Sequence, residues 1–97
     1  MSNLALLTGR HVRRINLDKA AQKELERTDA TTRRRLINGI AGLLEEPPQG
    51  DIKPLRGPLS GLSRLRVGSW RITYELTDDV INVLAITPRS GAYKGGM

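Results

Sequence analysis

The feature that most constrains the fold of this chain is a change of hydrophobic period at a segment rich in proline and glycine. Before Pro47, apolar side chains recur every three to four residues, which is the spacing of one face of a helix. After Gly61 they alternate with polar side chains, which is the spacing of a half-buried strand. Helices followed by strands predict an α+β domain, with an antiparallel sheet packed on the helices.

The first half is predicted to be an antiparallel helical hairpin over about residues 18–45. Asp18 is a candidate N-cap for the first helix, and the polar cluster 29–32 offers candidate N-caps for the second. Pro47 and Pro48 end the second helix, because proline lacks the backbone N–H that a further turn requires. The apolar residues that share a helix face are Ala21 and Leu25 in the first helix, and Leu36, Ile37, Ile40, Leu43 and Leu44 in the second.

The second half is predicted to be an antiparallel meander of three strands. Gly68-Ser69 is a natural tight turn between the first two strands, because glycine adopts a positive φ without steric cost. Asp78-Asp79 is a weaker turn signal before a third strand at 80–86. The expected buried face carries Leu65, Val67, Ile72 and Tyr74 or their immediate neighbours, and Trp70 and Leu76 share the strand face of Ile72 and Tyr74. The opposite face carries Arg64, Arg66, Arg71, Thr73 and Glu75.

The remaining segments complete the predicted order. A short strand at 11–17 precedes the helices, which gives the element order β-α-α-β-β-β. The segment 49–62 is dense in glycine and proline and is predicted to be a loop. Residues 1–10 are expected to be an extension and residues 11–97 a single domain, because a chain of 97 residues can bury one modest core.

Composition narrows the class of function. The chain has no cysteine and one histidine, His11, which argues against thiolate and histidine-based chemistry, and no cofactor or metal is expected. No run approaches the roughly 20 apolar residues of a membrane span, and the N-terminus lacks the charge order of a secretory signal, so a cytoplasmic protein without a membrane partner is expected. The formal net charge is +6, and 12 of the 16 lysines and arginines are arginine, so a phosphate-bearing or acidic partner is expected.

Three strand arginines are not explained by hairpin formation. If the strand register puts Arg71 on the same face as Arg64 and Arg66, like charges crowd one side of a small sheet and need a counter-ion. Glu75 is the expected internal counter-ion of Arg71, because alternate residues of a strand share a face. A solvated ladder with one Glu–Arg pair and a binding site for an external anion are both open at this point.

Arg89 and Tyr93 follow the last predicted strand. Taken singly, they are a surface loop charge and a tail tyrosine that packs its ring on the domain. Together with the strand arginines they form a polybasic group with one phenol, which can donate or accept a hydrogen bond or stack on a base. Such a group suits the binding of RNA phosphate.

Two segments of the chain resemble the RelE/ParE toxin superfamily: "KPLRGPLSGLSRLRVGSWRITYEL" and "VINVLAITPRSGAYK". The shared pattern is K-x-L-x-G, then L, then R-x-R-x-G-x-[WY]-R-[IV]-x-Y, a short acidic turn, a strand and R-x-x-x-Y. The likeness covers about residues 11–94 and includes the β-α-α-β-β-β order. The combination of "RLRVGSWRITYEL" with "PRSGAY" is specific, whereas either part alone is weak.

The resemblance implies the toxin of a type II toxin–antitoxin system, which a cognate antitoxin neutralises and which meets operator DNA only through that antitoxin. RelE-like members cleave mRNA without a metal, typically in the ribosomal A site, by attack of the 2′-OH on the adjacent phosphate. On the RelE pattern the catalytic positions are Arg64, Arg66, Arg71, Arg89 and Tyr93. Further RNA phosphate contacts are expected from Lys53, Arg56 and Lys94.

One departure from RelE concerns proton transfer. RelE has lysines where this chain has Arg64 and Arg66, and arginine does not release its proton near neutral pH. Tyr93 is then the only titratable group in the implied catalytic set, and a phenol with an ordinary pKa is a poor base there. Two alternatives remain, a ParE-like inhibitor of DNA gyrase and a catalytically degenerate toxin fold that only binds partners. Arg89 together with Tyr93 favours the nuclease, because ParE-like relatives generally lack this set.

Overall fold

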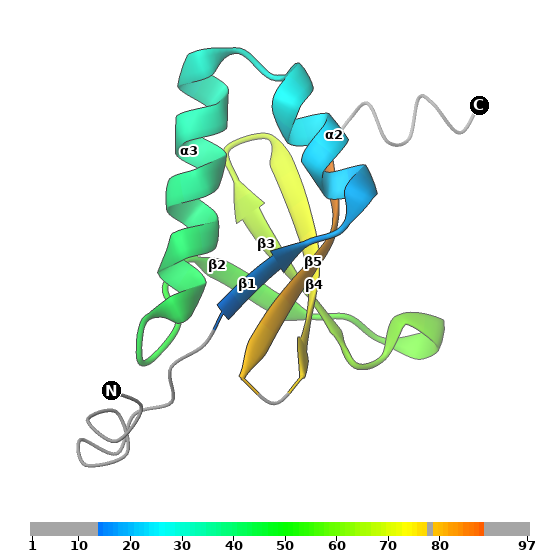
Figure 1. Cartoon of the computed structure of the whole chain (residues 1–97). Coiled ribbons are helices and arrows are strands. Elements are labelled where there is room, and N and C mark those ends of the chain that lie inside the picture. Colours follow the sequence, from blue (N-terminus) through cyan, green and yellow to red (C-terminus); the bar gives the residue numbers. More distant parts are fainter. Residues whose placement is uncertain (1–13, 78, 89–97) are drawn as a thin grey trace.

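A helical hairpin lies across one face of a five-stranded sheet in the computed structural model of the chain (Figure 1). The structure describes residues 14–77 and 79–88. These residues confirm the expected α+β class and the order of the predicted elements. The elements are β1 (Arg14–Leu17), α2 (Lys19–Arg27), α3 (Ala30–Ala41), η1 (Gly42–Leu44), β2 (Asp51–Pro54), η2 (Gly57–Leu59), β3 (Leu62–Val67), β4 (Trp70–Thr77) and β5 (Val80–Pro88), where η marks a short 3-10 helix.

The strands follow one another across the sheet in the order β1-β5-β4-β3-β2. The pairs β2–β3, β3–β4 and β4–β5 are antiparallel, whereas β1 pairs with β5 in parallel. The turn between β3 and β4 falls at the predicted Gly68-Ser69, where Gly68 has a φ of 60° and Val67 pairs with Trp70. The three C-terminal strands therefore form the expected meander, with β1 and β2 at the edges of the sheet.

The strand β2 corrects the prediction that the whole segment 49–62 is a loop. Four residues of this segment pair with β3, with Lys53 opposite Arg64 and Pro54 opposite Ser63. A strand this short between glycines and prolines shows too little alternation to be recognised in sequence. Pro54 is tolerated at its end because β2 is an edge strand. This pairing brings two further charged residues, Asp51 and Lys53, beside the arginines of β3.

The core lies between the helices and the sheet. Leu65, Ile72 and Tyr74 are buried and Val67 packs on them, so the predicted buried face is confirmed at these positions, whereas Leu76, farther along the same face of β4, is 47% exposed. The prediction is wrong for Ile37, which was expected on the apolar face of the second helix. Its side chain is 46% exposed and does not belong to the buried face of α3. The buried apolar residues are Ala21, Leu25, Leu36, Ile40, Leu43, Leu65, Ile72, Tyr74, Ile81, Val83 and Ile86.

The second helical segment ends before the prolines, as predicted. α3 stops at Ala41, and one turn of 3-10 helix carries the chain to Leu44. Pro47 and Pro48 then lie in the irregular segment that leads to β2. Within the described residues, no helix is long and apolar enough to cross a bilayer.

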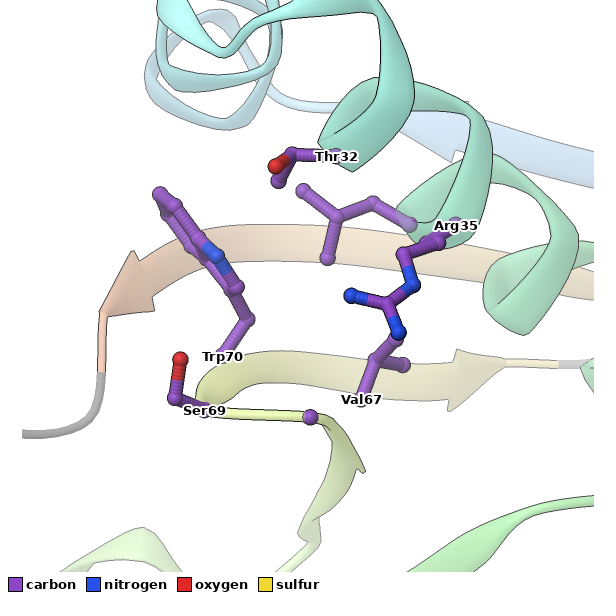
Figure 2. Close-up of a pocket in the computed structure, with 7 residues that line it drawn as sticks. Thr32, Arg35, Val67, Ser69 and Trp70 are labelled. Carbon is purple, nitrogen blue, oxygen red and sulfur yellow. The ribbon is translucent and has the colours of Figure 1, made fainter.

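α3 packs closely against the sheet at Gly39. A Cβ atom at this position would lie 2.6 Å from Cγ2 of Val67, so only glycine lets the helix come this near to β3 without a shift of the neighbouring side chain. Towards the start of α3, by contrast, a pocket of about 150 Å³ lies between the helix and the β3–β4 hairpin (Figure 2). Leu36, Val67 and Trp70 contribute its apolar lining.

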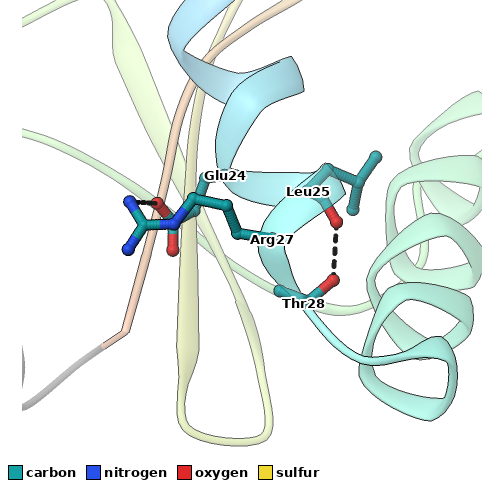
Figure 3. Close-up of polar contacts among 4 residues, drawn as sticks. All are labelled: Glu24, Leu25, Arg27 and Thr28. Carbon is teal, nitrogen blue, oxygen red and sulfur yellow. Dashed lines mark hydrogen bonds and ion pairs between the residues drawn. The ribbon is translucent and has the colours of Figure 1, made fainter.

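The turn between α2 and α3 is closed by local hydrogen bonds. The Oγ1 hydroxyl of Thr28 donates to the carbonyl oxygen of Leu25 at 2.6 Å, and Arg27 pairs with Glu24 one turn earlier (Figure 3). Asp29 is the N-cap of α3, because its Oδ1 accepts from the backbone N–H of Thr32 at 3.2 Å. Asp18 occupies the N-cap position of α2 but makes no capping hydrogen bond with its side chain.

Arg33 of α3 joins the two helices by hydrogen bonds to the end of α2. Its Nε donates to the carbonyl of Leu25 at 3.2 Å, and its Nη2 donates to those of Glu26 at 3.2 Å and Thr28 at 2.6 Å. These carbonyls lie at the C-terminal end of α2, where no further helical turn satisfies them. Arg33 therefore has a structural role.

Candidate functional site

The strand register places the strand arginines on one face of the sheet. Arg66 lies directly opposite Arg71, and Arg64 lies opposite Thr73. Leu65, between the two arginines of β3, pairs with Ile72 and is buried beneath the helices. Because alternate residues point to opposite sides of a strand, the arginines lie on the face away from the helical hairpin. The question that the sequence left open, whether Arg71 shares their face, is answered by this register.

We call Arg64, Arg66 and Arg71 the arginine cluster. Lys53 joins it from β2, where it is the register partner of Arg64. Four cationic side chains from three neighbouring strands therefore share one region of the sheet. Like charges placed directly opposite one another destabilise a sheet unless an anion balances them.

Arg64 has an unusual environment for a guanidinium group. The residue is only 6% exposed, and no other charged residue in the described part of the chain is buried to this degree. Its Nη1 makes no hydrogen bond. A buried donor without an acceptor is costly, and more so when it carries a charge. Arg64 is thus held in a position that an anion on this face would stabilise.

Among the residues that the structure describes, Asp51 supplies the carboxylate closest to Arg64 and Arg66. Its Oδ2 lies 3.9 Å from Nη1 of Arg64 and 4.0 Å from Nη1 of Arg66. Both distances exceed a hydrogen bond, and the Asp51 side chain is 59% exposed, so this contact is a weak, solvent-screened attraction. This exposed carboxylate therefore balances only part of the charge of Arg64 and Arg66.

The expectation that Glu75 is the counter-ion of Arg71 is wrong. Glu75 lies opposite Leu62 and Asn82, four residues along β4 from Arg71. Four residues of strand span about 13 Å, so two side chains can share a face without touching. Asp51 lies beside the arginines of β3 instead, and the sequence did not reveal it because β2 is too short for its alternation to be recognised.

The other predicted site residues fall outside the cluster or outside the described residues. Arg56 is exposed in the loop between β2 and β3, beyond the last paired residue of β2. Arg89, Tyr93, Lys94 and His11 lie outside the described residues. β5 ends at Pro88, and its Thr87 pairs with Arg71, so the chain leaves the sheet beside the cluster.

The fold and the arginine cluster define a class of protein. The chain shares its fold, a helical hairpin over a five-stranded sheet, with a solved RelE toxin. The model of the family described as the ParE toxin of type II toxin–antitoxin systems matches residues 15–93. This match spans more than half of the chain, which therefore belongs to this toxin family.

Solved structures agree with this assignment. The RelE–RelB complex of Pyrococcus horikoshii is similar over 80% of this chain and 96% of that one, with 29% identity and a TM-score of 0.68. The RelBE2 toxin–antitoxin complex of Mycobacterium tuberculosis has 23% identity and a TM-score of 0.69 over 79% of this chain and 98% of that one. The YoeB/ParE toxin of Agrobacterium tumefaciens has 20% identity and a TM-score of 0.66, over 77% and 96%. The last two likenesses show the fold alone. No curated protein sequence matches the chain.

Proposed function

We propose that this toxin cleaves RNA, and that the arginine cluster binds the phosphate at the cleavage site. The observation that carries this proposal is Arg64, a buried guanidinium whose Nη1 makes no hydrogen bond and whose nearest carboxylate is 3.9 Å away. Arginine offers a planar fork of donors that matches two phosphate oxygens at once. Arg66 and Arg71, opposite one another in the register, would hold the same group from the side.

The reaction needs fixed positive charge more than it needs a cofactor. The 2′ oxygen of one nucleotide bonds to the adjacent phosphorus, and the bond from phosphorus to the 5′ oxygen of the next nucleotide breaks. The 2′-hydroxyl loses its proton and the departing 5′ oxygen gains one, so the products are a 2′,3′-cyclic phosphate and a 5′-hydroxyl. Negative charge builds on the non-bridging oxygens in the transition state, and one preorganised donor aimed at such an oxygen contributes about 3 kcal/mol.

Arg89 and Tyr93 complete the proposed site. They follow β5 in sequence, and β5 ends beside Arg71. In the proposed mechanism Arg89 adds a charge on the phosphate, and Tyr93 stacks on a base or exchanges the proton of the 2′-hydroxyl. Lys53, Arg56 and Lys94 contact neighbouring phosphates.

The proposed setting is the cytoplasm, with mRNA in the ribosomal A site as substrate and a cognate antitoxin as regulator. Support for the antitoxin comes from structural relatives that were solved as toxin–antitoxin complexes. An antitoxin that lays acidic or apolar groups over the arginine cluster would neutralise the toxin by masking it. Operator DNA would then be reached only through the antitoxin.

The central test replaces Arg71, which lies opposite Arg66 on the half-buried part of the face. Arg71→Ala is expected to keep the fold and to slow cleavage of ribosome-bound mRNA by about 100-fold or more, as loss of a preorganised donor does. Arg71→Lys is expected not to restore full activity, because an ammonium group is a point charge and not a fork.

Three further variants complete this experiment. Arg34→Ala is the matched control, because Arg34 is an exposed arginine on α3 and should cut like the parent. Tyr93→Phe separates stacking, which it preserves, from proton transfer, which it removes. Folded Arg71→Ala and Arg89→Ala proteins that both cut like the parent would place the active site elsewhere.

A second candidate function is inhibition of DNA gyrase. It is favoured by one observation, namely that the family model which matches this chain is that of the ParE toxin. Assays of the purified toxin in solution distinguish RNA cleavage from gyrase inhibition. A purified toxin that leaves ribosome-bound mRNA intact and inhibits gyrase supercoiling would be ParE-like, and the arginine cluster would then serve protein binding.

A further inference from the structure

The pocket between α3 and the β3–β4 hairpin is a second concave site, separate from the arginine cluster. Its lining residues are Thr32, Arg35, Leu36, Val67, Gly68, Ser69 and Trp70. Figure 2 shows Arg35 reaching from α3 towards the hairpin and Trp70 on the other side of the opening, with Thr32 and Ser69 at its rim. A volume of about 150 Å³ is the size of a cavity that holds one benzene-sized group.

The packing of α3 explains why the pocket exists. The helix touches β3 at Gly39, where a Cβ would come within 2.6 Å of Val67. Thr32 and Arg35 lie one to two turns nearer the start of the helix, and there the space between helix and hairpin is not filled. Leu36 is fully buried, so the accessible apolar surface of the pocket comes from Val67 and Trp70, which are both half-buried.

The charge of the pocket comes from Arg35. Arg33 donates to three carbonyl oxygens of the α2–α3 turn, so it is committed to the fold. Arg35 is exposed and has no hydrogen bond or ion pair with any residue in the described parts of the chain. A cation beside an apolar wall suits an anchor side chain with a carboxylate next to it, because arginine binds carboxylates through two hydrogen bonds.

The pocket and the arginine cluster face opposite ways. Val67 and Trp70 are a register pair on the helix side of the hairpin, whereas Arg66 and Arg71 are the neighbouring pair on the other side. An RNA phosphate held by the cluster therefore does not reach the pocket. A polypeptide that passes around the end of the hairpin can contact both faces.

We propose that this pocket anchors the cognate antitoxin through one leucine- or phenylalanine-sized side chain, and that an aspartate or glutamate beside that anchor pairs with Arg35. The net charge of +6 on the toxin favours an acidic partner segment over a neutral one. The inference rests on the proposed function in one respect, namely that the partner is an antitoxin. It adds where that partner is held, on the side of the hairpin away from the cluster.

The test uses Trp70 as its reporter, because it is the only tryptophan of the chain. The probe is the purified protein encoded beside the toxin gene, titrated into the full-length toxin. Binding is expected to shift Trp70 emission to shorter wavelength as water is displaced from the indole. Arg35→Glu is expected to weaken binding by about tenfold or more, as a reversed charge at a buried interface pair does.

Arg34→Glu is the matched control, because it reverses the same charge one residue away and Arg34 does not line the pocket. It is expected to weaken binding less than about threefold, through long-range charge alone. Equal losses in the two variants would overturn the proposal, and so would antitoxin binding that leaves Trp70 emission unchanged. If RNA affinity and not antitoxin affinity falls in Arg35→Glu, the pocket belongs to the nucleic acid and the proposal is wrong.

The isolated Arg35→Glu toxin is expected to cleave RNA like the parent. A failure of the proposed function would be seen in the parent, as absence of cleavage. A failure of this inference would be seen only in antitoxin binding. The two outcomes are therefore distinguishable.

Discussion

At the scale of single residues, the arginines of this chain differ in which groups their side-chain N–H groups contact. Arg33 donates to backbone carbonyls and holds a helical turn. Arg64 is buried on the open face of the sheet, yet its Nη1 makes no hydrogen bond. A residue kept in a costly environment is expected where function requires it. The burial of Arg64 is therefore a better guide to the site than the number of arginines.

This difference predicts a trade-off at Arg64. Arg64→Met removes the buried charge and keeps most of the side-chain volume, so the free energy of unfolding is expected to stay constant or to rise by up to about 2 kcal/mol. RNA cleavage is expected to fall by about 100-fold or more, because a phosphate donor is lost. Urea unfolding followed by circular dichroism and a cleavage assay measure the two quantities on the same preparation.

Arg64→Lys serves as the control, because it keeps a charge at the same position. It is expected to retain more activity than Arg64→Met and to gain no stability. A Met variant that unfolds far more easily than the parent would show that Arg64 stabilises the fold, and it would remove the main support for a phosphate site.

At the scale of elements, the start of α3 depends on a titratable cap. Hydrogen bonds from the side chain and then the backbone of Thr32 hold the pKa of Asp29 below its ordinary value of 3.8, although Asp29 is fully exposed. A carboxylate whose pKa is lower in the folded state stabilises that state above its unfolded pKa. This contribution is lost as the pH falls through the lower, folded pKa.

Asp29→Asn is therefore expected to be less stable than the parent at pH 7 and equally stable near pH 2, where both side chains are neutral. Asparagine still caps the helix, so the comparison isolates the charge of the cap. Thermal unfolding of both proteins across this pH range measures it. A difference in midpoint temperature that does not change with pH would contradict the assignment of this charge to the helix start.

At the scale of the whole molecule, the chain has an excess of positive charge, and the face of the sheet that holds the arginine cluster has few carboxylates. The formal net charge is +6, and the cluster region gathers Lys53, Arg64, Arg66 and Arg71 against Asp51. A partner whose phosphates contact several cations releases counterions when it binds. The affinity for RNA should therefore depend steeply on salt.

Each phosphate contact to single-stranded RNA contributes about −0.7 to the slope of log affinity against log salt concentration. Arg66→Ala is expected to make this slope shallower by about that amount and to weaken binding to all RNA sequences alike. Fluorescence anisotropy with a labelled, non-cleavable RNA at several salt concentrations measures the slope. Arg34→Ala controls for net charge, and a slope that changes equally in both variants would argue against a defined phosphate site.

The sequence by itself determined the helical hairpin, the three strands of the meander and the two faces of those strands. Period 3.6 before the prolines and period 2 after them are local properties, and each is fixed by which side chains must avoid water. Burial of Leu65 and Ile72, and the turn at Gly68, follow from these patterns. The motif residues in β3 and β4 could be found for the same reason, since they alternate with the core.

The tertiary structure alone decided how strands meet, because register and edge pairing depend on contacts between residues far apart in the chain. It placed Arg66 opposite Arg71, and it made Asp51 rather than Glu75 the neighbour of the cluster. It also formed β2 from a segment that its glycines and prolines mark as a loop, since a partner strand supplies the hydrogen bonds that local sequence does not. The burial of Arg64 is likewise a property of the folded chain, because β3 lies inside the sheet between β2 and β4.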